Sequence, residues 1–93
     1  MREVIYGKKF VKSYKRVSRS GNFNNSELEM IVDILARNTE IPIKYHDHIL
    51  TGDFLGTREL HLRGNLLVIY RIEDDDSQVI FVDIGNHSNL FGM

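Results

Sequence analysis

The chain has 93 residues, 42% of them hydrophobic and 27% charged, with a formal net charge of −1 at pH 7 and no cysteine. This balance is typical of one small globular domain, residues 1–93, with a single hydrophobic core. Without cysteine there are no disulfides, thiolate metal sites or cysteine nucleophiles. The longest apolar run, residues 66–70, is too short to cross a membrane, and the charged N-terminus has no signal peptide pattern, so we expect a cytoplasmic protein with no membrane partner.

The N-terminal residues predict a strand followed by a helix. Residues 3–6 are apolar enough for a short strand, and the helix follows over residues 8–21. The helix has apolar residues at i, i+4 and i+7, which indicates one buried face: Phe10, Tyr14 and Val17.

The same segment is strongly basic. Residues 1–20 carry seven lysines and arginines against Glu3 alone, a net charge of +6, so the rest of the chain carries −7. A concentrated basic face suits ribosomal RNA or an acidic partner, although many such faces are only solvated. The candidate RNA and ribosome contacts are Lys8, Lys12, Lys15, Arg16 and Arg19.

Residues 24–38 predict a second helix. Ser26 and Glu29 have the spacing of a capping box, and Pro42 keeps the helix from continuing. Its apolar stripe consists of Leu28, Ile31, Val32 and Leu35. The two helices should form a hairpin with an apolar inner side.

Three strands are predicted next, over residues 58–63, 66–72 and 78–84. Gly64 and Asn65 suit a two-residue hairpin turn, which would pair Arg63 with Leu66, His61 with Val68 and Glu59 with Tyr70. The element order is then β-α-α-β-β-β. We expect an α+β fold in which the helix hairpin covers one face of an antiparallel sheet.

Strand alternation separates a leucine face from a polar face in residues 58–63. Because the helices need apolar contacts, the face of Leu60 and Leu62 should be covered and His61 should lie on the open face. Glu59, Arg63 and Tyr70 would join His61 there. The other histidines flank this strand: His46 and His48 precede it, and His87 follows the last strand. Histidine titrates near neutral pH and so suits proton transfer.

The candidate site fits the chemistry of RNA cleavage. No nucleophile elbow, phosphate-binding loop or dinucleotide motif is present. In RNA cleavage the substrate's own 2′-hydroxyl is the nucleophile, so the protein supplies only a base, an acid and positive charge near the phosphate. A metal-binding domain using His46, Asp47, His48 and His61 is a weaker alternative, because the histidine spacing is not specific.

The segments "DHILTGDFLGTRELHLRGNLLVIYRI" (47–72) and "GNHSNLFG" (85–92) resemble the YafQ-type branch of the RelE superfamily of type II toxin–antitoxin toxins. The resemblance implies a RelE-like fold and a metal-independent endoribonuclease that cuts mRNA in the ribosomal A site, without a cofactor or a metal ligand. It also implies a cognate antitoxin, a small protein like RelB or DinJ, with operator DNA bound only indirectly through that complex. A degenerate toxin that acts only as a co-repressor is the alternative.

The resemblance also implies roles for single residues. His48, His61 and His87 match the catalytic histidines, Phe91 matches a terminal aromatic residue that stacks on a base, and Glu59 matches an acidic position. Arg63 and Tyr70 are further candidates for substrate binding. The chain departs from the family pattern at Asn65 and Leu66, where members often carry Asp-Trp, and at Leu67 and Asp83, where arginines are found.

The last residues predict a structured tail. Gly85 would let the chain turn off the final strand and bring His87 toward His61. Ser88 would start a short helical turn, Leu90 would anchor it in the core, and Phe91 would project beside the histidines.

Overall fold

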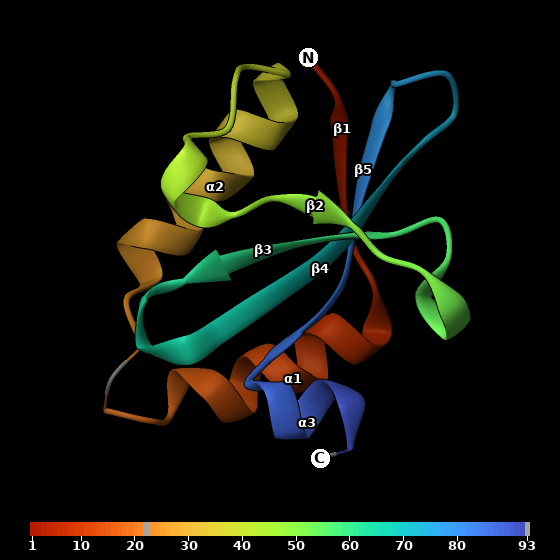
Figure 1. Ribbon diagram of the computed structural model, residues 1–93. Coiled ribbons are helices and arrows are strands. Elements are labelled where there is room, and N and C mark those ends of the chain that lie inside the picture. The colour runs from red at the N-terminus through yellow and green to blue at the C-terminus, as the bar shows by residue number, and fades with distance from the viewer. Residues whose placement is uncertain (22, 93) are drawn as a thin grey trace.

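The computed structural model describes residues 1–21 and 23–92 and has an α+β fold, as predicted (Figure 1). The described strands and helices are β1 (Glu3–Tyr6), α1 (Lys8–Ser18), α2 (Asn25–Arg37), β2 (His48–Ile49), β3 (Arg58–Leu62), β4 (Leu66–Glu73), β5 (Gln78–Gly85) and α3 (His87–Phe91). Short 3-10 helices lie at Ile43–Tyr45, Gly52–Phe54 and Arg63–Asn65. No helix in the described part of the chain is long and apolar enough to span a membrane.

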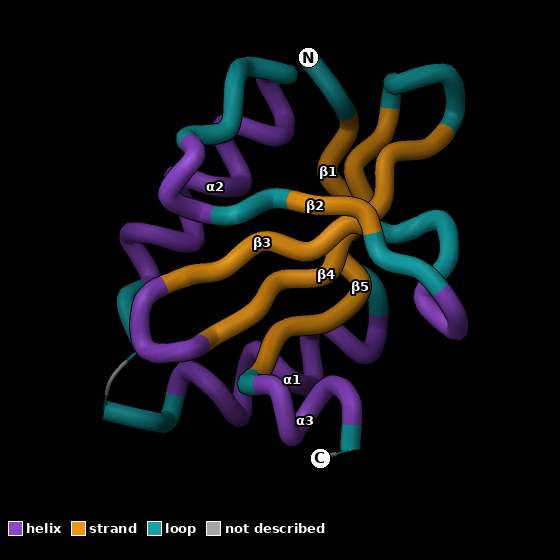
Figure 2. Tube along the Cα trace, viewed as in Figure 1, coloured by secondary structure: helices purple, strands orange, loops and turns teal. Residues whose placement is uncertain are grey.

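The strands form one five-stranded sheet in the order β1-β5-β4-β3-β2 (Figure 2). The predicted antiparallel pairing holds from β3 to β5. The unpredicted β2 also pairs antiparallel with β3, whereas β1 pairs with β5 in parallel. Apolar alternation shows which face of a strand is buried, not which way an edge strand runs, so this direction was not predictable. The two-residue strand β2 was too short to give a periodic pattern.

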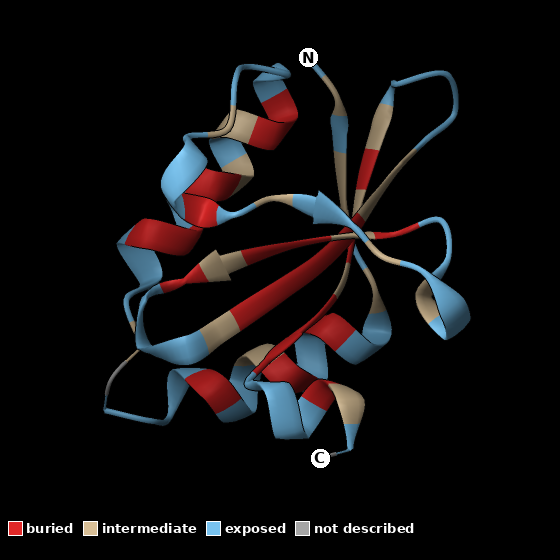
Figure 3. Ribbon diagram, in the orientation of Figure 1, coloured by how far each residue is buried: buried red, intermediate tan, exposed pale blue. Residues whose placement is uncertain are grey.

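Helices α1 and α2 cover one face of the sheet, as predicted. Their buried residues Phe10, Leu28 and Ile31 pack with Leu60 and Leu62 of β3. Figure 3 shows the buried residues concentrated in the central strands and on the inner sides of α1 and α2. His61 therefore lies on the opposite sheet face from the helix hairpin, which confirms the predicted orientation of β3.

The helix ends differ from the prediction. Helix α1 ends at Ser18, before Gly21. Helix α2 begins at Asn25, and the Asn24 side chain accepts a hydrogen bond from the backbone N–H of Glu27 (3.2 Å). The predicted Ser26–Glu29 capping box is therefore wrong, because Asn24 takes the N-cap position two residues earlier.

The β3–β4 turn is one residue longer than predicted, which shifts the strand register. Leu62 pairs with Leu66, and the intervening Gly64 and Asn65 both have positive φ (75° and 62°). Arg63 is drawn into the turn because its backbone N–H donates to Glu27 Oε1 of α2 (3.0 Å). The predicted pairs of His61 with Val68 and Glu59 with Tyr70 are therefore wrong; His61 pairs with Leu67, and Glu59 with Ile69.

Candidate functional site

A buried carboxylate holds two of the predicted histidines together. Glu59 is only 5% exposed, and its Oε1 lies 3.4 Å from His48 Nε2 and 3.3 Å from His61 Nε2. The β2–β3 pairing places His48 directly beside Glu59, and His61 follows two residues later on the same strand face. Both imidazoles remain about half exposed, so a substrate can reach them.

The backbone further fixes the His48 ring. His48 Nδ1 lies 2.7 Å from the carbonyl oxygen of His46, so Nδ1 carries a proton, because a carbonyl only accepts. The other ring nitrogen, Nε2, faces Glu59 at 3.4 Å and is the atom that can exchange a proton with a substrate.

A polar network anchors the loop that carries His48. Asp47 accepts hydrogen bonds from Arg58 Nε (3.1 Å) and Nη2 (2.8 Å), and from the hydroxyl of Tyr70. Burial and the hydrogen bond to Asp47 raise the pKa of Tyr70. This clamp joins the loop to β3 and β4 and so sets the position of the next residue, His48.

The location of Tyr70 corrects the sequence prediction. Tyr70 pairs with Arg58, belongs to the helix-covered core and is 1% exposed, so it does not share a face with His61. The one-residue register shift is the cause, because it moves every β4 side chain to the other face. Tyr70 therefore acts on the site only indirectly, from the helix-covered face, through its hydrogen bond to Asp47.

Arg63 lies near His61 but in the β3–β4 turn, not in the strand. Its exposed guanidinium is 3.5 Å from Glu27 Oε2. His61, Arg63, Lys44 and Tyr45 line a surface hollow of about 600 Å³ with residues at the start of α2. Lys44 and Arg63 bring two positive charges beside the imidazole, and Glu27, which pairs with Arg63, brings one negative charge, so the hollow is net positive.

The second part of the site is α3. Leu90 is buried against Leu67 and Ile69, which confirms the predicted anchor. The Phe91 ring lies 4.8 Å from the His87 ring and 5.1 Å from the Phe54 ring, centroid to centroid. Phe91 is thus beside one histidine, and Phe54 is an aromatic neighbour that the sequence did not indicate.

Gly85 has a different role from the one predicted. Its φ is not positive. Glycine is needed there because a Cβ atom at this position would lie only 3.0 Å from Asn89 Cβ. Glycine lets α3 fold back closely onto the end of β5. The helix begins at His87, one residue before Ser88, because Asn86 and Asn89 form a reciprocal capping box (2.8 and 3.2 Å).

The strand register relates the two parts of the site. Leu67 of β4 pairs with His61 on one side and with Gly85 on the other. Two strand spacings separate the backbone of His61 from that of Gly85 by roughly 10 Å. Between Glu59 and α3, this face of the sheet consists of apolar side chains, including Leu67 and Ile69.

Three of the positions that depart from the family pattern have structural roles in this chain. Leu67 is buried, and Asp83 is buried with its carboxylate 3.4 Å from Lys9 Nζ and bonded to the backbone N–H of Ile84 (2.9 Å). Asn65 occupies the left-handed turn position.

The predicted basic contact residues on and next to α1 are all exposed: Lys8, Lys12, Lys15, Arg16 and Arg19.

The cluster also has the geometry of a metal site. One ligand atom from each of His48, Glu59 and His61 lies within 4.8 Å of the others. Of the four residues in the metal-binding alternative, only His48 and His61 belong to this group. His46 is not part of it, and the Asp47 carboxylate binds Arg58 and Tyr70 instead.

The chain is similar to known bacterial toxins along nearly its whole length. Residues 2–92 match the family described as "Bacterial toxin of type II toxin-antitoxin system, YafQ". The mRNA interferase toxin YafQ of Escherichia coli K12 is 28% identical over 92 residues, covering 98% of this chain and 97% of the relative.

Two solved structures show the same fold. A metal-bound toxin from Helicobacter pylori is 35% identical with a TM-score of 0.88, covering 98% of this chain and 100% of that one. YafQ in the E. coli DinJ–YafQ complex is 27% identical with a TM-score of 0.85, covering 99% and 100%. With the match over residues 2–92, these findings place the chain in the YafQ family of bacterial toxins of type II toxin–antitoxin systems.

Proposed function

We propose that this protein is an endoribonuclease that cuts mRNA on the ribosome, in the A site, in the cytoplasm, with residues 1–93 acting as one toxin domain. The carboxylate of Glu59 between the imidazoles of His48 and His61 is the observation that carries the proposal. It holds two imidazoles, both suited to proton transfer, side by side at the surface. The name of the E. coli relative, mRNA interferase toxin, supports the same activity.

The cleavage step needs one proton acceptor and one proton donor. The 2′-hydroxyl of the RNA attacks the adjacent phosphorus as a base removes its proton, and the bond to the 5′-oxygen breaks as an acid protonates that oxygen. His48 and His61, which flank Glu59, are the two groups proposed for these roles. His87 would lie beside the phosphate, and Lys44 and Arg63 would stabilise its developing negative charge.

Phe91 would position the nucleotide. Its ring lies beside those of Phe54 and His87 and is partly exposed, so a base can reach it. Base stacking on an aromatic side chain contributes about 1–3 kcal/mol per base.

The direct test compares cleavage of mRNA bound to programmed ribosomes with cleavage of the same RNA free in solution. We expect cuts only, or mainly, on the ribosome, and loss of cutting in Glu59→Gln, which keeps the size of the side chain. In cells, expression without antitoxin should arrest growth. A chain that binds its antitoxin but neither cuts mRNA nor arrests growth is instead a co-repressor.

The basic face of α1 is expected to bind ribosomal RNA. Reversing Lys8, Lys12 and Lys15 together to glutamate should weaken ribosome association and flatten its salt dependence, since each lost phosphate contact removes about 0.7–0.9 from the slope of log K against log salt. Sedimentation binding assays at several salt concentrations measure both effects. Arg71→Glu, on β4, is the control. If it changes ribosome association as much as the lysine variant does, the lysines make no specific contact with ribosomal RNA.

Metal binding is a second candidate role, favoured by the compact group of His48, Glu59 and His61 and by the metal-bound H. pylori relative. Calorimetric titration of tag-free protein with Cu²⁺ or Zn²⁺ should show one site, lost in His48→Asn. Because the ligand atoms are the proposed proton-transfer atoms, bound metal should inhibit cleavage, and EDTA should restore it. Cleavage abolished by EDTA would instead show a metal-dependent enzyme.

A further inference from the structure

The hollow beside His61 reaches the start of α2. Its volume of about 600 Å³ is within the range of sites that hold a small molecule, about 300–1,000 Å³. Three segments line it: the start of α2, the 3-10 helix Ile43–Tyr45, and the end of β3 with the turn that follows. His61 lies in this lining and also beside Glu59, so a ligand in the hollow would lie next to the histidine pair.

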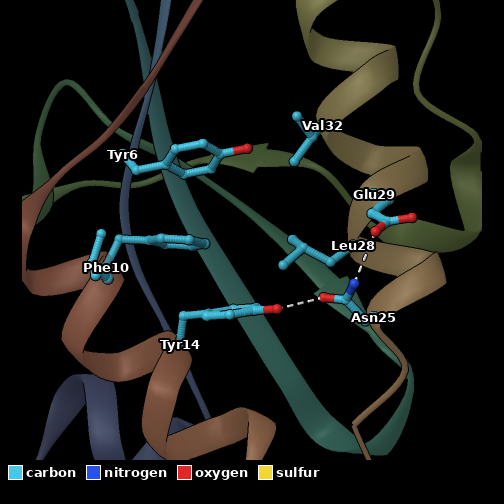
Figure 4. Close-up of a pocket in the computed structure, with 8 residues that line it drawn as sticks. Tyr6, Phe10, Tyr14, Asn25, Leu28, Glu29 and Val32 are labelled. Carbon is cyan, nitrogen blue, oxygen red and sulfur yellow. Dashed lines mark hydrogen bonds between the residues drawn. The ribbon is translucent and has the colours of Figure 1, made fainter.

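Helix α2 presents different polar side chains on its two sides. Toward α1, Asn25 accepts a hydrogen bond from the Tyr14 hydroxyl (2.7 Å) and donates one to Glu29 Oε1 (2.9 Å), as Figure 4 shows. These polar groups are already paired. On the other side, Asn24 and Ser26 line the hollow, and both are exposed.

Asn24 presents hydrogen-bond donors to the hollow. Its side-chain oxygen accepts from the backbone N–H of Glu27 (3.2 Å), which caps α2 and fixes the amide. The amide nitrogen, with two N–H donors, is therefore the group that Asn24 offers to a ligand, and Ser26 adds a hydroxyl. An asparagine pairs with adenine through both its oxygen and its nitrogen, so an asparagine whose oxygen is occupied is a poor match for adenine.

Two cations add further donors. Lys44 Nζ lies 5.2 Å from the centroid of the Tyr45 ring, a cation–π contact that orients the ammonium. The exposed Arg63 side chain faces Glu27 Oε2 with its Nε atom (3.5 Å), which leaves the two terminal nitrogens of the guanidinium to bind a ligand. The lining therefore offers mainly donors, at a net positive charge.

The remaining lining residues suit a ring with polar edges. Met30 is 45% exposed and gives the face of a base an apolar surface to pack on. The Tyr45 hydroxyl is a buried polar atom without a hydrogen-bond partner in the described part of the chain. Buried polar groups are normally paired, so this lining has unused capacity for hydrogen bonds.

We propose that the hollow binds the base of one of the two nucleotides that flank the cut, and that it selects guanine, while Phe91 stacks on the other base. Guanine presents two acceptors, O6 and N7, on one edge, which match the donors of Asn24 and Ser26. Adenine has an amino donor in place of O6, and cytosine and uracil lack N7. This proposal rests on the proposed nuclease function and names the nucleotide that one part of the same site recognises.

The positions of the hollow and of Phe91 fit two neighbouring nucleotides. His61 belongs to both the hollow and the histidine pair. Phe91 lies in α3, which follows β5, two strand spacings or roughly 10 Å from β3. An RNA that places its scissile phosphate at the histidine pair can therefore reach the hollow with one nucleotide and Phe91 with the next.

The test measures cleavage rates on ribosomes programmed with mRNAs that carry each of the four bases at each of the two positions flanking the cut. At one of these positions, the unaltered chain should cut guanine about tenfold faster than adenine, the discrimination expected of one good two-donor contact. Replacing this guanine by 7-deazaguanine, which lacks the N7 acceptor, should remove most of the preference.

Asn24→Asp is the decisive variant. Aspartate is as good an N-cap as asparagine, so α2 should keep its cap, but its carboxylate offers acceptors in place of the amide donors. The ratio of the guanine rate to the adenine rate should fall about tenfold, to one or below. A general loss of stability or RNA affinity would lower both rates and leave this ratio unchanged. Ser26→Ala, which removes one donor, should lower the ratio less.

Asn38→Asp is the matched control. Asn38 is exposed at the other end of α2, 14 residues or about 21 Å from Asn24, and aspartate tolerates its φ of 55°. This variant adds the same charge to the same helix and should leave the ratio unchanged; an equal fall would overturn the proposed contact.

The remaining outcomes separate the two proposals. Cleavage by the unaltered chain without a guanine preference, or with one that Asn24→Asp leaves intact, overturns the base-recognition proposal alone. No cleavage by the unaltered chain at any base overturns the proposed nuclease function and the base recognition together.

Discussion

His61→Ala is expected to lower the rate of mRNA cleavage by about 10²–10⁴-fold, the usual loss when a general acid or base is removed. The side chain is 43% exposed, so little packing is lost and the melting temperature should change little. Single-turnover cleavage on programmed ribosomes, with calorimetric melting, measures both quantities. His87→Ala should reduce cleavage on the same scale, because that residue is proposed to lie beside the phosphate.

His46→Asn is the control within the same cluster. The His46 ring lies 5.7 Å from the His61 ring, and its backbone has a φ of 51°, a conformation that asparagine tolerates. The carbonyl that accepts from His48 is retained, so cleavage should remain within a few-fold. If His61→Ala cuts as fast as His46→Asn, His61 is not a proton-transfer group.

Leu90→Ala is expected to destabilise the protein by about 2–5 kcal/mol, the range for truncating a buried leucine. In a domain of this size, each kcal/mol lowers the melting temperature by about 4–8 °C. Leu90 is the buried residue of α3 and holds the helix against Leu67 and Ile69. Its loss should therefore also misplace His87 and Phe91 and reduce cleavage at temperatures where the domain is still folded.

Leu55→Ala is the matched control, because Leu55 is 77% exposed and should contribute little to stability. Equal melting temperatures for the two variants would mean that α3 is not anchored by Leu90. A lower melting temperature with full cleavage would show that His87 and Phe91 do not need this anchor.

Local patterns predicted the layers of the fold well. The spacing of Leu28, Ile31 and Leu35 identified the buried side of α2, and the alternation around Leu60 and Leu62 identified the covered face of β3. These patterns depend only on neighbours in the sequence. The strand register does not, because the Arg63 N–H bonds to Glu27, which lies 36 residues earlier in the chain.

The same limit applies to the site. Sequence similarity indicated the three histidines and Phe91, and strand alternation placed Glu59 beside His61. The clamp of Asp47 with Arg58 and Tyr70 joins three separate segments, and Asp47 and Arg58 have no periodicity that reveals such a contact. Both do lie within the segment that resembles the toxin family, which was the one available indication. Phe54 could not be assigned, because its contact with Phe91 depends on where α3 folds back.

The hydrogen bond from Arg63 to Glu27 has a thermodynamic consequence. Glu27 lies in the first turn of α2, and Arg63 lies in the hollow beside His61. A partner that displaced the first turn of α2 would therefore also displace the loop next to the site. Linkage requires such an effect to be reciprocal: whatever factor antitoxin removes from the affinity for RNA, bound RNA removes from the affinity for antitoxin. A toxin already engaged on a ribosome would then be the hardest one for antitoxin to recapture.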